Sequence, residues 1–466
     1  MTLQWLPRPA AEPRRALVVA LLLLLCAWRG RGEAQAQPQP PRGPAVLTLR
    51  GCLEAAMERN RELSRAREEI ERVQGNRDVV RARLMPQISL TARYDALRTS
   101  LDGQTDDALA SNLRFSQRLF EFGPNAASEI QLRADLREAV YGYQGKVHEV
   151  LARVWELYHL ILLQDQQIAA REDSRASFED VLKRQSERFD RRLAPEEDKL
   201  RAELNVLKEE LAINKLRRQQ FSYKMELLRL IGQPLGTEVM VAGESETFGL
   251  EEDEAVGVAL RTDVQLALRE ELLVEQRRAV RELGWDYSPD IALDAGVEDG
   301  RRSAAVSVQR DGRAWGVDVA SELALSEREE PPADRGQTAW RTQVEARIPI
   351  LEGGARLGRE VAERARLRQL MIEVRDLRAG VELRVRQAYQ SLLEAQDQQR
   401  LQEQNVRIAR RRLEINESLK EKGLADEAKL EQVREQFFSA QDALFDNQST
   451  YISRQAALRR LMGYIE

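Results

Sequence analysis

The stretch Leu193-Ala194-Pro195-Glu196 returns as Leu424-Ala425-Asp426-Glu427, 231 residues further along a chain of 466 residues. Other residues share this offset: Gly123 with Gly354, Val154 with Val385, Tyr158 with Tyr389, Leu230 with Leu461, and Gly232 with Gly463. No gap is needed across this part of the chain. A duplication of this length predicts a pseudo-symmetric body built from two similar halves.

Closer to the N-terminus the offset between the halves is 203 residues, which relates Leu63 to Leu266 and Pro86 to Pro289. The step from 203 to 231 predicts an insertion of 28 residues between residues 290 and 345. We therefore divide the chain into a first repeat, 48–235, an inter-repeat linker, 236–251, and a second repeat, 252–466, with the insertion near 299–335.

The composition favours long helices over a compact globule. Charged residues make up 32% of the chain and aromatic residues only 5%, a balance typical of coiled coils. The net charge of −5 is too small to imply a strongly acidic or basic partner, and no basic patch interleaved with aromatic residues indicates nucleic acid.

The N-terminus has the pattern of a secretory signal peptide, residues 1–36. Arg14 and Arg15 precede the apolar run from Ala16 to Trp28, and Ala34-Gln35-Ala36 forms a cleavage site. Two alternatives stay open: an uncleaved membrane anchor, and a lipoprotein attached through Cys26. Residues 37–47 are rich in proline and read as a linker. The mature chain keeps one cysteine, Cys52, which cannot form an internal disulfide.

The apolar spacing predicts helices in both halves. Residues 49–84 and about 252–283 read as helices that end before Pro86 and Pro289. The segment from Pro124 to Pro195 has heptad-like spacing, which predicts a helix on the order of 100 Å long. A second helix follows from Glu196 to Ile231, and the second half repeats this hairpin from Gly354 to Gly463.

Alternating runs predict four main strands, two in each half. Apolar residues alternate with polar ones in four runs: 87–94, 112–119, 291–297 and 340–350. The polar stretch 100–111 reads as a loop, and Arg93, Arg114 and Arg118 fall on the polar side of their runs. Within the insertion, Val317, Val319, Leu323 and Leu325 alternate, which indicates an extended hairpin followed by an exposed loop.

Four such strands are too few to close a membrane barrel alone. Strands of this kind are the right length to cross a bilayer at a tilt, which takes roughly 9–11 residues. Two interpretations follow: several copies could share one barrel, or each hairpin could be a small cap on a soluble coiled coil.

Several motifs, taken in order, resemble the TolC-type outer-membrane efflux proteins. The quoted segments are Leu47-Thr48-Leu49-Arg50-Gly51-Cys52-Leu53, Arg83-Leu84-Met85-Pro86-Gln87-Ile88, Arg347-Ile348-Pro349-Ile350-Leu351-Glu352-Gly353-Gly354 and Leu461-Met462-Gly463. The resemblance covers nearly the whole mature chain. Each motif alone is weak, but their order and duplication are specific.

The resemblance implies a mainly α fold with β: duplicated coiled-coil hairpins forming an α-barrel, and two β-hairpins giving four strands per copy to a trimeric, 12-stranded outer-membrane β-barrel. It implies an efflux or type I secretion conduit reaching through the periplasm. Its partners would be a periplasmic adaptor and, indirectly, an inner-membrane transporter. The alternative from the residues alone is a soluble periplasmic coiled-coil adaptor or structural protein.

In this family the turns between paired long helices form the periplasmic entrance and contact the adaptor. The resemblance assigns this role to the following tip residues: Arg188, Arg192, Leu193, Ala194, Gly423, Leu424 and Ala425. The sequence departs from the family pattern, because Arg192 stands at the glycine position of the first tip and Leu419 at the arginine position of the second. Nearby acids could form an entrance ring, or serve as ordinary helix ends: Glu196, Glu197, Asp198, Asp426 and Glu427.

No pattern in the sequence indicates an enzyme or a cofactor. His148 and His159 are the two histidines, and about 16 Å of helical rise between them is too far for one metal ion. The chain lacks the usual spacings of metal, phosphate-binding and nucleophile motifs. We expect no catalytic site, no metal and no cofactor.

Overall fold

The computed structural model describes residues 45–466 apart from 83–84, 99–104, 123–126, 244–248, 282, 284–289, 300–301, 312–313, 325–338, 348–353, 423, 425–426 and 464–466. The predicted signal peptide, Cys26 and most of the predicted 37–47 linker lie outside the described residues. So do much of the 299–335 insertion and three tip residues, Gly423, Ala425 and Asp426.

Within its described residues, the first repeat contains four helices, of which the third is by far the longest. They are α2 (Leu49–Arg59), α3 (Arg61–Arg81), α4 (Ala127–Asp190) and α5 (Glu196–Leu230). The 64 residues of α4 correspond to about 96 Å, as the sequence predicts. The prediction of one helix over 49–84 is wrong, because the helix breaks at Asn60.

The second repeat has the same four helices in the same order. They are α6 (Glu252–Thr262), α7 (Val264–Arg281), α8 (Ala355–Glu421) and α9 (Glu427–Met462). The predicted single helix over 252–283 also breaks, here at Asp263, the residue that the 203-residue offset matches to Asn60. Within the described part of the chain, none of the helices is both long and apolar enough to cross a membrane.

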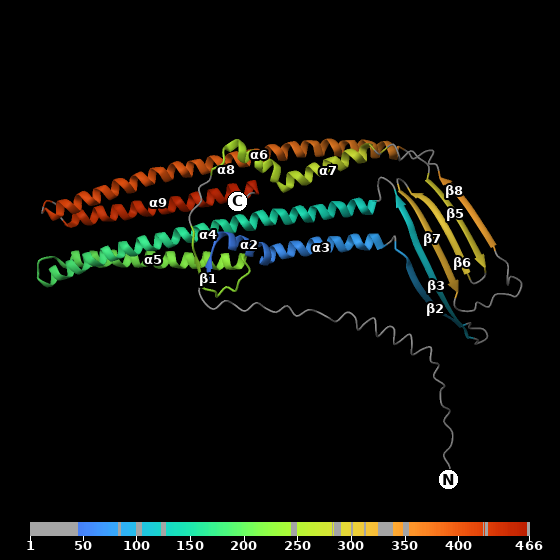
Figure 1. The fold of residues 1–466 in the computed structure, drawn as a ribbon, viewed down its shortest axis with the longest axis horizontal. Coiled ribbons are helices and arrows are strands. Elements are labelled where there is room, and N and C mark those ends of the chain that lie inside the picture. Colours follow the sequence, from blue (N-terminus) through green and yellow to red (C-terminus); the bar gives the residue numbers. More distant parts are fainter. Residues whose placement is uncertain are drawn as a thin grey trace, which may run out of the picture. The chain divides into compact units, whose positions relative to one another are not determined.

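Each long helix packs against two shorter helices that follow one another along its length. Helix α4 contacts α3 and α5, and α8 contacts α7 and α9 (Figure 1). The segment with heptad-like spacing supplies much of the core, because Val154, Tyr158 and Ile161 of α4 are buried with Leu227 of α5. The matching Val385 of α8 is buried beside Leu458 of α9. Helices α4 and α9 contact each other and join the repeats.

Six strands form one antiparallel sheet in the order β2-β3-β7-β6-β5-β8. Their bounds are β2 (Gln87–Arg98), β3 (Thr105–Phe122), β5 (Asp290–Asp299), β6 (Arg302–Asp311), β7 (Ala314–Ala324) and β8 (Ala339–Arg347). The predicted count of four sheet strands is wrong, because the predicted hairpin of the insertion pairs into the middle of the sheet (Figure 1).

Two further differences concern strand boundaries. Strand β3 begins at Thr105, so most of the predicted 100–111 loop is strand, held by pairing with β2 from Arg98↔Thr105 onward. Two short strands, β1 (Ala45–Leu47) and β4 (Val239–Val241), pair in parallel. They occupy the end of the predicted N-terminal linker and part of the predicted inter-repeat linker, where proline and charge patterns gave no strand signal.

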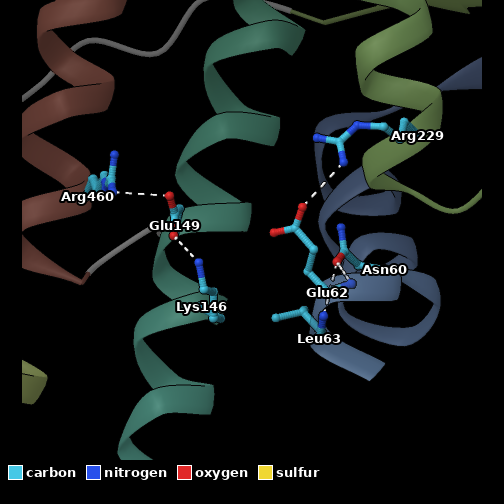
Figure 2. Close-up of polar contacts among 7 residues, drawn as sticks. All are labelled: Asn60, Glu62, Leu63, Lys146, Glu149, Arg229 and Arg460. Atoms are coloured by element: carbon cyan, nitrogen blue, oxygen red, sulfur yellow. Dashed lines mark hydrogen bonds and ion pairs between the residues drawn. The ribbon is translucent and has the colours of Figure 1, made fainter. Parts of the chain in front are cut away.

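The break at Asn60 is stabilised by hydrogen bonds to two helices. The Asn60 Oδ1 accepts from the backbone N–H groups of Glu62 (2.8 Å) and Leu63 (3.1 Å), which caps α3. Its Nδ2 donates to the Leu230 carbonyl at the end of α5, 2.9 Å away. The Arg229 guanidinium lies 3.3 Å from the Glu62 carboxylate across the same junction (Figure 2).

The equivalent junction of the second repeat uses different side chains. Asp263 Oδ1 accepts from the Leu266 N–H at 2.8 Å and caps α7, while the Thr262 hydroxyl donates to the Met462 carbonyl at the end of α9. Arg460, the repeat partner of Arg229, instead reaches Glu149 of α4 at 3.2 Å (Figure 2). This ion pair joins the two repeats.

A glycine with a left-handed backbone conformation follows α5 at the first junction and α9 at the second. Gly232 has φ +69° and Gly463 has φ +62°. A Cβ on Gly232 would lie 2.6 Å from the Arg59 carbonyl oxygen, and one on Gly463 would lie 2.7 Å from the His148 ring. Both the backbone conformation and the close approach therefore require glycine.

We expect Gly232→Ala to lower the free energy of unfolding by more than about 1 kcal/mol, from left-handed strain alone. The clash with the Arg59 backbone adds to this cost. The measurement is thermal unfolding followed by helical circular dichroism. The control is Gly75→Ala in α3, where a Cβ meets nothing within 4 Å and helix propensity adds about 0.5–1 kcal/mol. Equal unfolding temperatures for the two variants would contradict this account.

Candidate functional site: the sheet faces and the helical tips

The sheet has one apolar face that continues across every strand. The register places one row of side chains over all six strands: Ile88, Phe115, Ser321, Ala304, Val297 and Trp340. A second row crosses four strands: Val317, Val308, Leu293 and Val344. Because side chains alternate between faces, these rows lie on the same side of the sheet.

The opposite face is polar. One of its rows contains Ser89, Arg114, Glu322, Ser303, Glu298 and Ala339, and another contains Asp318, Ser307, Asp294 and Gln343. Arg114, which the sequence places on the polar side, lies directly opposite Glu322. The side chains of Arg93 and Arg118 lie outside the described residues.

Much of the apolar face is exposed in a single copy. Ile88 is 71% exposed, Val344 68% and Trp340 79%. An exposed apolar surface of this continuity is uncommon on a protein that stays alone in water. The face is therefore a candidate contact surface for an apolar partner.

The first helical tip, between α4 and α5, is closed by backbone hydrogen bonds. The Leu193 N–H donates to the Arg188 carbonyl at 2.8 Å, and the Arg192 N–H donates to the Phe189 carbonyl at 2.8 Å. This pair of bonds defines a Schellman motif, in which the residue after the helix adopts a left-handed conformation. The second tip has the matching bond, from the Leu424 N–H to the Leu419 carbonyl at 2.9 Å.

Arg192 occupies that left-handed position with φ 58°. Among the described residues it is the one non-glycine residue with a positive φ. The sequence departure at the family's glycine position therefore leaves the turn geometry in place. The conformation costs more for arginine than for glycine because of its Cβ.

The predicted tip residues form an exposed surface. Leu193 is 66% exposed and Leu424 74%, and the repeat offset makes them equivalent. Arg188 and Arg192 are also exposed, and Ala194 is half-buried. Gly423 and Ala425 lie outside the described residues. Two equivalent exposed leucines at chain reversals are candidates for contact with another protein.

The predicted acidic residues of the first tip stand in the first turn of α5, where the helix dipole favours negative charge. Glu196 and Glu197 are exposed and Asp198 is half-buried. The Glu197 carboxylate lies 3.1 Å from Arg201, one turn along the helix. Asp426 lies outside the described residues, and Glu427 is the first residue of α9.

Helix α5 carries an exposed apolar stripe that was not predicted from the sequence. Its members recur with 4-3-4 spacing: Leu200, Leu204, Leu207 and Leu211, each more than half exposed. A matching stripe on α8 contains Leu401, Ile408 and Ile415. The spacing was readable as a coiled-coil seam, but the sequence does not say which seams are filled within one copy.

Polar side chains of α4 and α5 contact α9 of the second repeat. Arg171 of α4 donates to Glu209 of α5 at 2.9 Å and to Asp442 of α9 at 2.5 Å. Burial raises the pKa of the Asp442 carboxyl, although the Arg171 charge opposes this shift. Asn205 of α5 donates to Glu431 of α9 at 2.9 Å. These contacts fix the two helical hairpins against each other.

The two histidines have packing roles in this structure. The His159 ring is buried and its Nδ1 lies 2.9 Å from the Trp155 carbonyl oxygen. Burial lowers the pKa of His148, whose ring lies beside Gly463. Across the described ranges, no group of three or more His, Cys, Asp and Glu side chains is placed to hold a metal ion.

A family model described as outer membrane efflux protein matches residues 52–233 and 273–464. The search of curated proteins finds no match. Similar solved structures include VceC of Vibrio cholerae, with 16% identity, 90% of this chain and 97% of VceC covered, and a TM-score of 0.64.

The Campylobacter jejuni outer membrane channel CmeC is similar at 14% identity, with 92% of this chain and 90% of CmeC covered and a TM-score of 0.63. The open state of Neisseria gonorrhoeae MtrE is similar at 16% identity, with coverages of 92% and 94% and a TM-score of 0.62. At such identities the likeness establishes the fold.

We expect Arg192→Gly to stabilise the first tip by about 0.5–1 kcal/mol, because it removes left-handed strain. Arg192→Val should destabilise it, since a β-branched side chain tolerates a positive φ less well. The measurement is hydrogen exchange of the Leu193 amide, which should slow in the glycine variant and quicken in the valine variant. Identical exchange in both would show that the turn is not held in this conformation.

Proposed function

This chain belongs to the outer membrane efflux protein family, the family that its motifs predict, and on that premise we propose that three copies form an outer-membrane channel-tunnel. The channel would carry solutes or proteins outward in efflux or type I secretion. Its energy would come from an inner-membrane transporter, coupled through a periplasmic adaptor. The observation that carries the proposal is the continuous apolar face of the sheet.

The apolar face would contact lipid and the polar face would line water. Six strands with alternating faces satisfy the pattern of a membrane barrel wall. The strands of the six-stranded sheet contain 9 to 18 residues, enough for a tilted crossing of the hydrocarbon layer. A single sheet leaves backbone groups unpaired at its two edges, which lipid does not tolerate. If further copies closed the sheet into a barrel, the backbone groups at both edges would be paired.

The order of elements supports a ring of copies. The sheet begins with β2 of the first repeat and ends with β8 of the second. Among the helices, α4 contacts α9, which leaves α5 and α8 as the outer members of the two hairpins. In the sheet, as among the helices, one outer element belongs to the first repeat and the other to the second. A head-to-tail ring would therefore join β8 to β2 and α8 to α5 of the next copy.

The exposed stripes on α5 and α8 fit this closure. Each stripe lies on an outer helix of its hairpin, and each has the spacing of a coiled-coil seam. Packing α5 of one copy against α8 of the next would bury both stripes. The partner of these stripes is then a second copy of this chain.

The tips would meet the adaptor at the periplasmic entrance. Leu193 and Leu424 are exposed at equivalent turns, and such leucines are suited to insertion between helices of another protein. Arg188, Arg192 and the neighbouring Ala194, Gly423 and Ala425 complete the proposed docking surface. The soluble adaptor-like alternative has no comparable support, because it leaves the apolar sheet face without a partner.

Disruption of the α5 stripe should break the assembly. Leu204→Glu combined with Leu207→Glu removes burial that contributes about 2 kcal/mol per leucine and puts charge in the seam. We expect this variant to run as a monomer in mild detergent, as judged by light scattering after gel filtration. Met240→Glu is the control, because Met240 is 60% exposed but lies in β4, off both stripes. A trimeric double variant would contradict the proposed contact.

The acidic residues of the tips should tune ion selectivity. Repetition by three would concentrate the field of Glu196, Glu197, Asp198, Asp426 and Glu427 at a narrow mouth. We expect the variant with Glu196, Glu197 and Glu427 changed to Gln and Asp426 to Asn to lose cation preference in planar bilayers, with the loss greatest at low salt. Unchanged conductance and selectivity would rule out an entrance role. A protein that forms no channels would contradict the proposed function itself.

A further inference from the structure

The inserted hairpin, β6 and β7, lies in the interior of the sheet. Strand β7 pairs with β3 of the first repeat, and β6 pairs with β5 of the second. These two strands are therefore the only described link between the β-hairpins of the two repeats. The 28-residue step in the repeat offset falls at this hairpin.

We propose that this hairpin is part of the barrel wall and widens it. The inference rests on the proposed function, and it concerns the size of the solutes that the outer-membrane part admits. Three six-stranded sheets hold eighteen strands, in place of the twelve that the family resemblance implies. Bacterial barrels of this size leave an open aqueous channel.

The alternation of the hairpin matches that of the strands beside it. On β6, Ala304, Val306 and Val308 lie on the apolar face, opposite Ser321, Val319 and Val317 of β7. On the other face, Ser303 and Ser307 lie opposite Glu322 and Asp318. A hairpin folded into a water-filled lumen would expose these valines, whereas a wall strand places them against lipid.

The lengths of the two strands also fit a wall. Strand β6 has 10 residues and β7 has 11, which matches the roughly 9–11 residues that a tilted transmembrane strand needs. Eight register pairs join β5 to β6 between Ala292 and Asp299. A surface flap would not need pairing of this extent on both sides.

Insertion of two strands preserves the antiparallel alternation. Because β3 pairs antiparallel with β7, β7 with β6 and β6 with β5, the directions of β3 and β5 are opposite with or without the hairpin. The edge strands β2 and β8 keep opposite directions too. Closure between copies is therefore equally possible for six strands and for four.

The wider wall has a definite size. Strands about 4.8 Å apart and tilted by about 40° give a backbone diameter of about 36 Å for eighteen strands and about 24 Å for twelve. The cross-section of the lumen would more than double. Three copies would each contribute α4, α5, α8 and α9 to a helical ring, and twelve helices spaced 8–10 Å apart form a ring about 30–38 Å across. An eighteen-stranded barrel would therefore be about as wide as the helical ring. Bulky solutes, including polypeptides, would pass the outer-membrane part.

The test is electron cryo-microscopy of the full chain in lipid nanodiscs. We expect a closed wall of eighteen strands that includes residues 302–311 and 314–324. A closed wall of twelve strands, with those residues outside it, would overturn the inference and leave the proposed channel intact. A particle without any closed wall would overturn both.

Disulfide trapping gives a second readout in the outer membrane. Ser116→Cys with Ala320→Cys tests the β3–β7 contact, and Asp294→Cys with Ser307→Cys tests β5–β6; both pairs face each other in the register and should cross-link. The matched control, Ser116→Cys with Asp294→Cys, spans the hairpin and should stay reduced. Cross-linking of the control alone would place β3 beside β5 and overturn the inference. Cys52 is buried with its pKa raised to about 11 by burial, so it should not interfere.

Discussion

A sheet with one apolar face and two unpaired edges is unstable as an isolated object in water. Exposed side chains such as Ile88, Val344 and Trp340 call for an apolar environment, while β2 and β8 each present free backbone groups to a further strand. In the proposed channel, lipid would cover the apolar face and additional copies would pair with the two edges. The exposed stripes on α5 and α8 would be buried by the same assembly, so the proposed ring would complete both the sheet and the helices.

The duplicated junctions explain how the helical hairpins are positioned. In both repeats a short polar side chain caps a helix that packs along the long helix. Asn60 caps α3, and Asp263 caps α7. The glycine that follows α5 or α9 has a left-handed backbone conformation and allows a neighbouring residue to approach closely: Arg59 at Gly232 and His148 at Gly463. The side chains that bond the two helix ends differ between repeats, but the backbone geometry is the same. Arg460, the repeat equivalent of Arg229, forms an ion pair with Glu149 of α4 and so joins the two repeats.

Much of this fold could be predicted from local patterns. Pro86 and Pro289 mark the change from helix to strand, the heptads of α4 and α8 identify their buried faces, and the repeat offset locates the tips. The helix breaks were missed because an asparagine or aspartate is unremarkable inside a helix. The hydrogen bond from Asn60 to Leu230 stabilises the first break, but it joins residues far apart in sequence and so leaves no local pattern. The place of β6 and β7 within the sheet was missed for a similar reason, since strand order depends on pairing between distant segments. At the tip, the sequence shows an arginine at the glycine position, but only the structure shows that Arg192 keeps the left-handed conformation.

The central claim is that the chain is complete only as a ring of copies in a membrane. The most direct test is the native mass of the protein, extracted in mild detergent from the outer-membrane fraction. We expect a complex of three processed chains, with little protein in the soluble fraction. A soluble monomer or dimer would contradict it, because the sheet face and both helical stripes would then be stable without lipid and without a second copy.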